Sequence, residues 1–257
     1  MDTRPFGSAH VATFSSTDAL GSAAAQDFAD AVDAELAAAD EVTVILATGN
    51  SQLSFVDALH AHPEIDWSRI RVLHMDEYLG MHPDHPASFR LWMQNRIAEP
   101  FAPKAFYGMR GDHEPVAEEV DRYADLIRQL SPAICVMGIG ENGHLAFNDP
   151  PADFDTRDLV RIVELDEKCR VQQVNEGHFD SLGDVPPRAL SLTVHALTQP
   201  GTVLVLVPEA RKAEAVHAAL EGPVTPDCPA SILRTKSNVR IFLDHESSSL
   251  LSDRNAK

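Results

Sequence analysis

Cysteine is scarce in this chain of 257 residues, which contains only Cys135, Cys169 and Cys228. An odd count without the paired spacing of zinc ligands argues against a disulfide framework and against a cysteine-bound metal. Long apolar runs are also missing, because none approaches the roughly 20 residues of a membrane span. The first residues lack the charged and then apolar profile of a signal peptide. We therefore expect a cytoplasmic protein with structural thiols and no membrane partner.

Positive charge is in short supply. Lys and Arg total 21 against 39 Asp and Glu, which gives a formal net charge of −18. Nucleic-acid binding needs a basic stripe or patch, so this balance argues against a nucleic-acid partner. Acidity alone identifies no other partner, because it also simply favours solubility.

Repeats and low-complexity linkers are absent, and the length is ordinary for one α/β domain. Short β-branched runs predict five strands: Val42–Leu46, Ile70–Leu73, Ala133–Met137, Val203–Val207 and Val239–Leu243. Helical periodicity falls between such runs, at residues 28–36, 116–130 and 209–221. This alternation predicts a single α/β domain over residues 1–257, with a mostly parallel sheet covered by helices on both faces.

A glycine-rich run, Met-Gly-Ile-Gly-Glu-Asn-Gly-His-Leu-Ala-Phe-Asn-Asp-Pro, occupies residues 137–150. Gly138, Gly140 and Gly143 match the dinucleotide fingerprint G-x-G-x-x-G, which should open a helix. Two prolines at the end of the run stop any helix, and the run lies mid-chain rather than in a first βαβ unit. We interpret it as a catalytic turn at the carboxyl end of a strand, where ligands of open α/β sheets bind.

His144 and Asp149 lie five residues apart across this turn. That spacing lets the carboxylate orient or charge the imidazole, which is typical of acid–base catalysis. A histidine with a purely structural hydrogen bond is the alternative.

A polar turn follows the strand at 42–46 and precedes apolar residues at helical spacing. It comprises Thr48, Gly49, Asn50, Ser51 and Gln52. Free backbone amides and a helix dipole at such a turn favour a phosphate, although an ordinary capped βα turn has the same pattern. Lys212 lies in the first turn of the predicted helix at 209–221, where a cation is unfavourable unless an anion binds nearby. A solvated lysine is the alternative there.

Asp76 and Glu77 follow the carboxyl end of the strand at 70–73. Partial burial at such a position can raise the pKa of a carboxyl and so suit it to proton transfer. An acidic loop with a helix cap is the structural alternative. A metal cluster is a further one, although the spacing fits no standard zinc or two-histidine pattern. Its ligands would come from His74, Asp76, Glu77, His82, Asp84 and His85. We favour proton transfer without a metal, because the polar segments converge on one edge of the sheet.

At these residues the chain resembles the glucosamine-6-phosphate isomerase/deaminase family, which shares a Rossmann-like fold with the 6-phosphogluconolactonases. The shared motifs are Met-Asp-Glu-Tyr at 75–78, His-Pro-Ala-Ser at 85–88 and Gly-Glu-Asn-Gly-His-Leu-Ala-Phe-Asn-Asp-Pro at 140–150. The similarity extends from about Val42 to Ile241. Lactonases typically follow their Gly-His with Thr-Ala-Ser-Leu-Phe, so the continuation here favours the deaminase branch.

The resemblance implies an enzyme that converts glucosamine 6-phosphate and water to fructose 6-phosphate and ammonia, without a metal or other cofactor. It implies that His144 promotes ring opening, with Asn142 and Asp149 setting its charge and position. Asp76 would carry a proton between C2 and C1 of the open sugar. Residues 48–52 and Lys212 would hold the phosphate, with Gly138 and Gly140 against the substrate.

Three departures from the family are visible. Well-studied members often carry Asp at the position of Asn142 and Glu at that of Asp149, so any proton relay is shorter here. The family's lid often supplies an arginine to the phosphate, whereas residues 175–180, in a possible lid segment near 151–185, contain none.

Other functions remain open from the sequence. A related enzyme could act on galactosamine 6-phosphate or another sugar phosphate, or hydrolyse 6-phosphogluconolactone. A non-catalytic sugar-phosphate sensor is the third alternative, but the chain shows no DNA-binding module and its charge is unsuited to one. Several family members are hexamers, so this chain is a possible homo-oligomer.

Overall fold

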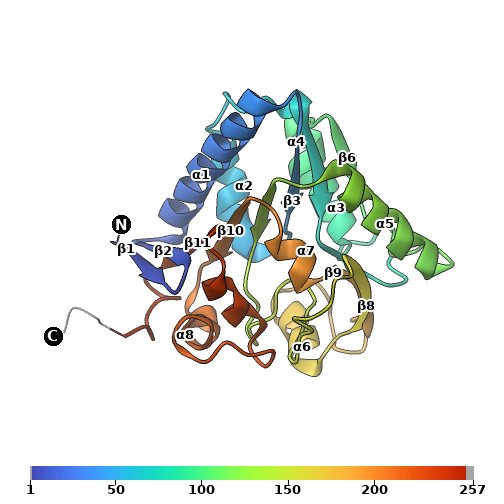
Figure 1. Ribbon diagram of the computed structural model, residues 1–257. Coiled ribbons are helices and arrows are strands. Elements are labelled where there is room, and N and C mark those ends of the chain that lie inside the picture. The colour runs from blue at the N-terminus through green and yellow to red at the C-terminus, as the bar shows by residue number, and fades with distance from the viewer. Residues whose placement is uncertain (1, 253–257) are drawn as a thin grey trace.

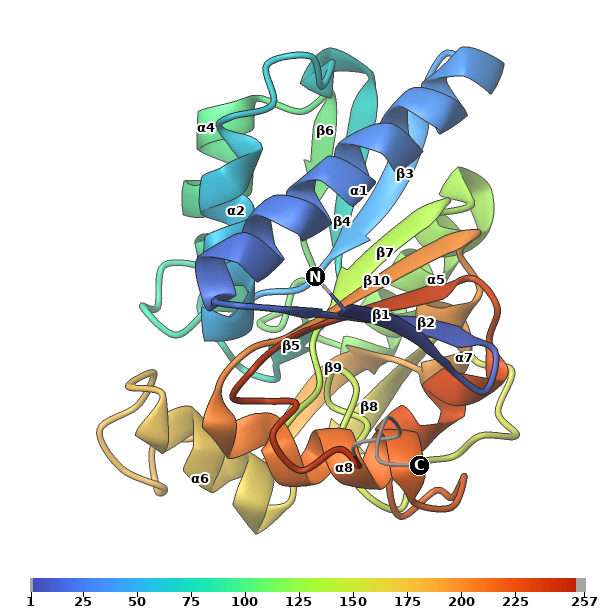
Figure 2. The same cartoon turned by 90° about the vertical axis from the view of Figure 1, so that its left-hand side faces the viewer.

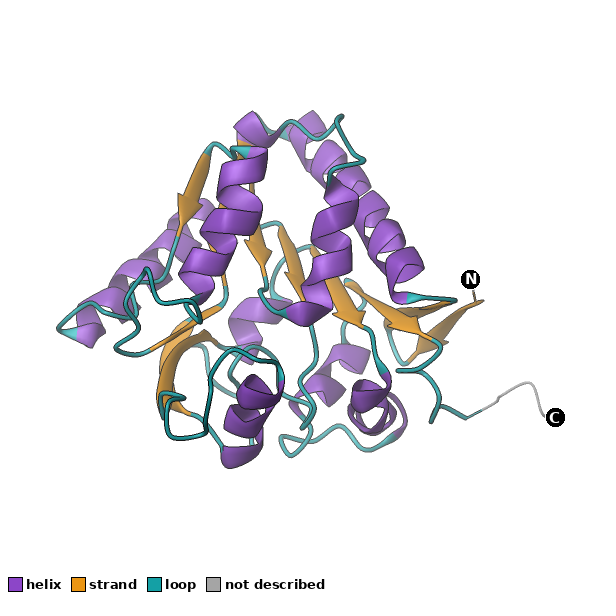
Figure 3. Ribbon diagram, turned by 180° about the vertical axis from the view of Figure 1, so that it is seen from behind, coloured by secondary structure: helices purple, strands orange, loops and turns teal. Residues whose placement is uncertain are grey.

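The computed structural model describes residues 2–252, apart from the side chain of Asp2, and its centre is an eight-stranded sheet (Figure 1). Strand order across the sheet is β1-β2-β11-β10-β7-β3-β4-β6. The strands are β1 (Asp2–Phe6), β2 (Ala9–Phe14), β3 (Val42–Leu46), β4 (Ile70–His74), β6 (Ala105–Tyr107), β7 (Ile134–Met137), β10 (Thr202–Val207) and β11 (Val239–Asp244). Only β1 pairs antiparallel with its neighbour. The carboxyl ends of the parallel strands therefore share one edge, towards which the central arrows point in Figure 3.

Helices cover both faces of this sheet (Figure 2). One face packs against α1 (Thr17–Ala38), α2 (Leu53–Leu59) and α3 (Phe89–Met93), which continues through a π-helical turn into α4 (Glu99–Phe101). The other face packs against α5 (Val116–Leu130), α7 (Val194–Thr198) and α8 (Ala213–Glu221). The mostly parallel α/β sheet with helices on both faces is confirmed.

The two cores follow from alternation within single strands. In β3, Val44 and Leu46 belong to the core beneath α1 and α2, whereas Ile45 belongs to the core beneath α5. Successive side chains of a strand point to opposite faces, so a strand covered on both sides is apolar at most of its positions. All five residues of β3 are buried, and all but Thr43 are apolar, so its sequence does not alternate between apolar and polar residues.

A second, three-stranded antiparallel sheet lies beyond the carboxyl edge. Its order is β5 (Asp76–Tyr78), β9 (Arg188–Leu192) and β8 (Val160–Glu164). The helix α6 (Glu167–Asn175) packs beside it around an aromatic cluster that contains Tyr78 and Phe147. This small sheet, with α6 and α8, builds the floor below the main sheet in Figure 1.

The five predicted strands form, each within one residue of its predicted bounds. β1, β2, β6 and the whole second sheet lie outside that prediction. The predicted helix at 209–221 starts four residues later as an α-helix, because Ala210–Lys212 form a 3₁₀ turn first. None of the helices in residues 2–252 combines the length and apolarity that a membrane crossing needs.

Candidate functional site

One pocket lies where β3, β4, β7 and β10 end, and it gathers most of the predicted site residues. Those that line it are Thr48, Gly49, Asn50, Ser51, Asp76, Gly138, Gly140, His144 and Lys212. Gln52 lies just behind the wall, 1% exposed, with its Nε2 donating to Ser51 Oγ at 2.9 Å. Asn142 and Asp149 lie outside the wall and contact His144. Segments far apart in the sequence therefore meet at one sheet edge, as predicted.

One end of the pocket suits an anion. Within residues 2–252, no acceptor receives a hydrogen bond from the backbone amides of residues 48–51. Lys212 lines the same pocket and is 3% exposed, and its ammonium makes no ion pair or hydrogen bond with any described residue. Burial lowers the pKa of the Lys212 ammonium, although nearby Glu176 opposes that shift. A buried cation without a partner is costly, so this end favours a bound anion such as a phosphate.

The two adjacent carboxylates have separate tasks. Glu77 is 1% exposed and holds the N-terminus of α3: its Oε2 accepts from Ser88 Oγ and from Arg90 N, both at 2.8 Å. Asp76, on the opposite side of β5, lines the pocket. The sequence-based expectation of a pair suited to proton transfer is therefore wrong for Glu77, which is a helix-capping residue.

Asp76 has the environment of a proton carrier. It is 6% exposed, and burial, with a smaller contribution from the charge of Glu77, raises the pKa of its carboxyl to about 8. A carboxyl tuned near neutral pH can both accept and return a proton.

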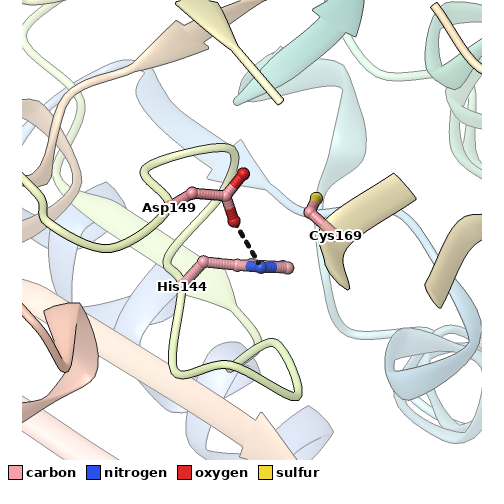
Figure 4. A group of neighbouring side chains, drawn as sticks. All are labelled: His144, Asp149 and Cys169. Atoms are coloured by element: carbon pink, nitrogen blue, oxygen red, sulfur yellow. Dashed lines mark ion pairs between the residues drawn. The ribbon is translucent and has the colours of Figure 1, made fainter. Parts of the chain in front are cut away.

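His144 is held by the turn that follows β7 (Figure 4). Its Nδ1 lies 3.2 Å from Asp149 Oδ1. Asn142 Nδ2 donates to the same Asp149 oxygen at 2.9 Å, and Asn142 Oδ1 accepts from the backbone amide of His144 at 3.0 Å. Burial alone would raise the pKa of the Asp149 carboxyl, but His144 and Asn142 lower it. Asn142 thus orients the pair by hydrogen bonds and carries no proton itself.

Two glycines permit close approach at this turn. A Cβ on Gly140 would lie 2.2 Å from Nε2 of His144, so the imidazole packs directly on the glycine backbone. A Cβ on Gly138 would lie 2.9 Å from Ser51 Oγ. These glycines therefore let the turn after β7 pack closely against the His144 ring and against Ser51.

Replacing Gly140 with alanine should displace the His144 ring. We expect a loss of about 1–3 kcal/mol in the free energy of unfolding, because the added methyl overpacks a filled site. Thermal melts and the NMR signals of the imidazole would measure both effects. Gly183→Ala is the control, since its Cβ would meet only Ser181 Oγ, at 3.7 Å. An unmoved His144 in G140A would contradict the prediction.

The alternative metal cluster around His74 does not assemble. His74 is fully buried, and its Nε2 accepts from the backbone amide of Met109 at 2.7 Å. Burial lowers the pKa of His74 to about 3, so the ring is neutral. His82 and Asp84 have side chains that are 69% and 84% exposed. Among the described residues these groups are dispersed and form no ligand set.

Part of the pocket wall lay outside the sequence-based prediction. It comes from α6 and the residues after it: Gln172, Gln173, Glu176 and His178. The apolar periodicity of α6 is weak, so its sequence gives little sign of a buried face. These residues belong to the segment 151–185, whose function as a lid remains a proposal.

Arg211 is a further pocket residue, and unlike its neighbour Lys212 it is fully paired. Its guanidinium lies 2.7 Å from Glu176, 3.1 Å from Glu141 and 2.6 Å from Glu209. Burial raises the pKa of Glu176, but His178 and Arg211 outweigh it and hold that pKa at about 2. Residues 175–180, which correspond to the family's arginine-bearing lid stretch but contain no arginine, thus present Glu176, which pairs with Arg211 from the turn after β10.

Comparisons with known proteins identify the family. The model of the family described as glucosamine-6-phosphate isomerases/6-phosphogluconolactonase matches residues 15–242. A glucosamine-6-phosphate deaminase of Exiguobacterium sibiricum is 38% identical over 212 residues, 82% of each chain. One from Streptococcus pneumoniae is 32% identical over 209 residues, 81% of this chain and 88% of the relative.

Solved structures of similar proteins share this fold. A monomeric glucosamine-6-phosphate deaminase superposes with a TM-score of 0.83 at 29% identity, over 93% of this chain and 99% of that one. A 6-phosphogluconolactonase from Thermotoga maritima shares the fold, with a TM-score of 0.71 at 18% identity over 92% and 98% of the two chains. The chain described above therefore belongs to the glucosamine-6-phosphate isomerase/6-phosphogluconolactonase family.

Proposed function

We propose that this chain is a glucosamine-6-phosphate deaminase, which converts glucosamine 6-phosphate and water to fructose 6-phosphate and ammonia. The observation that carries the proposal is one pocket lined by two chemically different sets of groups. The buried carboxyl of Asp76 and the imidazole of His144, paired with Asp149 behind the wall, line it together with the unpaired ammonium of Lys212. The relatives from Exiguobacterium and Streptococcus bear this activity in their names.

In this proposal the phosphate binds between Lys212 and the amides of residues 48–51. Binding energy from this remote group orients the reacting end of the sugar. His144 moves the proton that opens the ring, with Asp149 orienting its imidazole. Asp76 then takes the proton from C2 and returns it at C1, and water replaces the amine at C2 with release of ammonia. No step needs a metal or another cofactor.

Purified protein should release ammonia from glucosamine 6-phosphate in the presence of EDTA, with an equal amount of fructose 6-phosphate. An enzyme-coupled assay of both products measures this. Galactosamine 6-phosphate and 6-phosphogluconolactone test the related activities, and glucose 6-phosphate is the control without an amine. Loss of activity in EDTA, or no turnover of any amino-sugar phosphate, would contradict the proposal.

We also infer a small-molecule sugar phosphate as the partner and the cytoplasm as the location. Three cysteines without a disulfide, two of them buried, suit a reducing compartment. A homo-oligomer stays a possible state; the structural relative with a TM-score of 0.83 is described as monomeric.

A further inference from the structure

Three metal-ligating side chains meet beside the pocket. His144 and Asp149 come from the turn after β7, and Cys169 comes from the first turns of α6. One ligand atom from each lies within 4.8 Å of the other two, and no other such group of three occurs among residues 2–252. In Figure 4 the imidazole of His144 extends from its turn towards the helix that carries Cys169.

The imidazole in this cluster has an unused buried nitrogen. His144 is 8% exposed, and its Nδ1 has no hydrogen-bond partner among the described residues. Its polar neighbour is Asp149 Oδ1, 3.2 Å away, with which it forms an ion pair but no aligned hydrogen bond. An imidazole nitrogen, a carboxylate oxygen and a thiol therefore converge. A cation bound by all three would replace the proton that His144 and Asp149 share.

We propose that His144, Asp149 and Cys169 form an inhibitory site for a thiophilic divalent cation such as Zn²⁺ or Cd²⁺. Zinc bonds to sulfur, nitrogen and oxygen are about 2.0–2.3 Å long, so ligands on one tetrahedral ion lie about 3.5 Å apart. Side-chain rotations that move the ligand atoms by about 1 Å would bring them to that spacing. A thiol and an imidazole in the set exclude Mg²⁺ and Ca²⁺, which prefer oxygen ligands.

Metal binding exchanges the thiol proton of Cys169 for the cation. The Cys169 thiol loses its proton to solvent as the sulfur–metal bond forms, and no electron is transferred. Three protein ligands leave a fourth position for water. The inhibitory effect rests on the proposed function. A metal bound to Nδ1 of His144 separates the imidazole from Asp149 and prevents the imidazole from gaining and losing protons. Cys169 has no part in the proposed reaction, so the site restrains catalysis without supporting it.

Cobalt provides a readout that is independent of activity. Full-length protein, freed of metal by a chelator, should bind one equivalent of Co²⁺ and show a thiolate-to-cobalt charge-transfer band. The band should vanish in Cys169→Ser and in Cys169→Ala, with folding checked by circular dichroism. Cys228→Ser is the matched control, because Cys228 is only half-buried and lies outside the cluster. A wild-type chain without the band, or a band that survives in C169S, would overturn the site.

Inhibition is measured separately. Zn²⁺ should inhibit turnover of glucosamine 6-phosphate, and EDTA should reverse the inhibition. C169S should keep its basal turnover and need about 10- to 100-fold more Zn²⁺, a loss typical when a metal site is weakened. Cobalt binding without zinc inhibition would overturn the inhibitory role. A chain that bound cobalt but turned over no sugar phosphate would refute the proposed function and leave the metal site standing.

Discussion

Asp76→Asn should lower the turnover of glucosamine 6-phosphate by about 10²–10⁴-fold while substrate affinity changes little. The loss has this size because one positioned acid–base group typically contributes that much to the rate. Asparagine keeps the shape of the side chain but cannot accept the C2 proton. Steady-state kinetics that separate kcat from KM would measure the effect, and near-normal turnover would remove Asp76 from the mechanism.

The pH profile gives the same prediction a second readout. The pKa of Asp76 is raised to about 8, so the carboxyl is neutral below that pH and ionised above it. A reaction that needs the ionised base should accelerate as pH rises towards 8, and this rise should disappear in D76N.

The thermal stability of the variant distinguishes a loss of catalysis from a loss of folding. A carboxyl whose folded pKa exceeds its unfolded value, about 4, costs stability as the pH rises above the unfolded value. Asparagine removes that cost, so D76N should melt at an equal or higher temperature at pH 7. Glu77→Gln is the matched control: burial also raises the pKa of Glu77, but its carboxylate accepts from Ser88 Oγ and Arg90 N, which an amide cannot fully replace, so losing these bonds should lower stability. A D76N protein that unfolds more readily would contradict this account.

Lys212→Met should weaken the binding of inorganic phosphate and of phosphorylated sugars by about 10- to 100-fold. A charge-assisted hydrogen bond to phosphate is worth about 1.5–3 kcal/mol, and each 1.4 kcal/mol is a factor of ten. Methionine fills the space of the buried stem without its charge. Isothermal titration calorimetry with inorganic phosphate measures the loss without any assumption about turnover.

The same substitution at Lys168, an exposed lysine on α6, is the control and should leave phosphate binding unchanged. K212M should keep its thermal stability or gain some, because an unpaired ammonium in a buried site is costly. A variant that loses stability and binding together would point to a structural lysine.

The central sheet could be predicted because its strands are covered on both sides. Val203–Val207 is continuously apolar and Val42–Leu46 is apolar except at Thr43, which marks buried parallel strands in the sequence. β5 and β6 have three residues each, too few for a periodic pattern. The polar residues of β8 and of β9 lie three positions apart and so follow no period of two, and the pairing of these strands joins segments more than twenty residues apart. Such pairing depends on the rest of the fold.

The sequence by itself determined the family-specific turn at residues 140–150, the order of the five buried parallel strands with helices between them, and the sheet edge at which the polar segments end. Those properties are local: they depend on periodicity, on prolines that end helices and on residue types at fixed spacing. Only the tertiary structure decided which carboxylate faces the pocket, because Glu77 is engaged by the α3 N-terminus and Asp76 is not. It also decided that Arg211 is neutralised while Lys212 is left without a partner. Segments distant in sequence set the burial and the ion pairs of each side chain. Adjacent residues of the same charge, such as Asp76 and Glu77, therefore differ in environment only when the chain is folded.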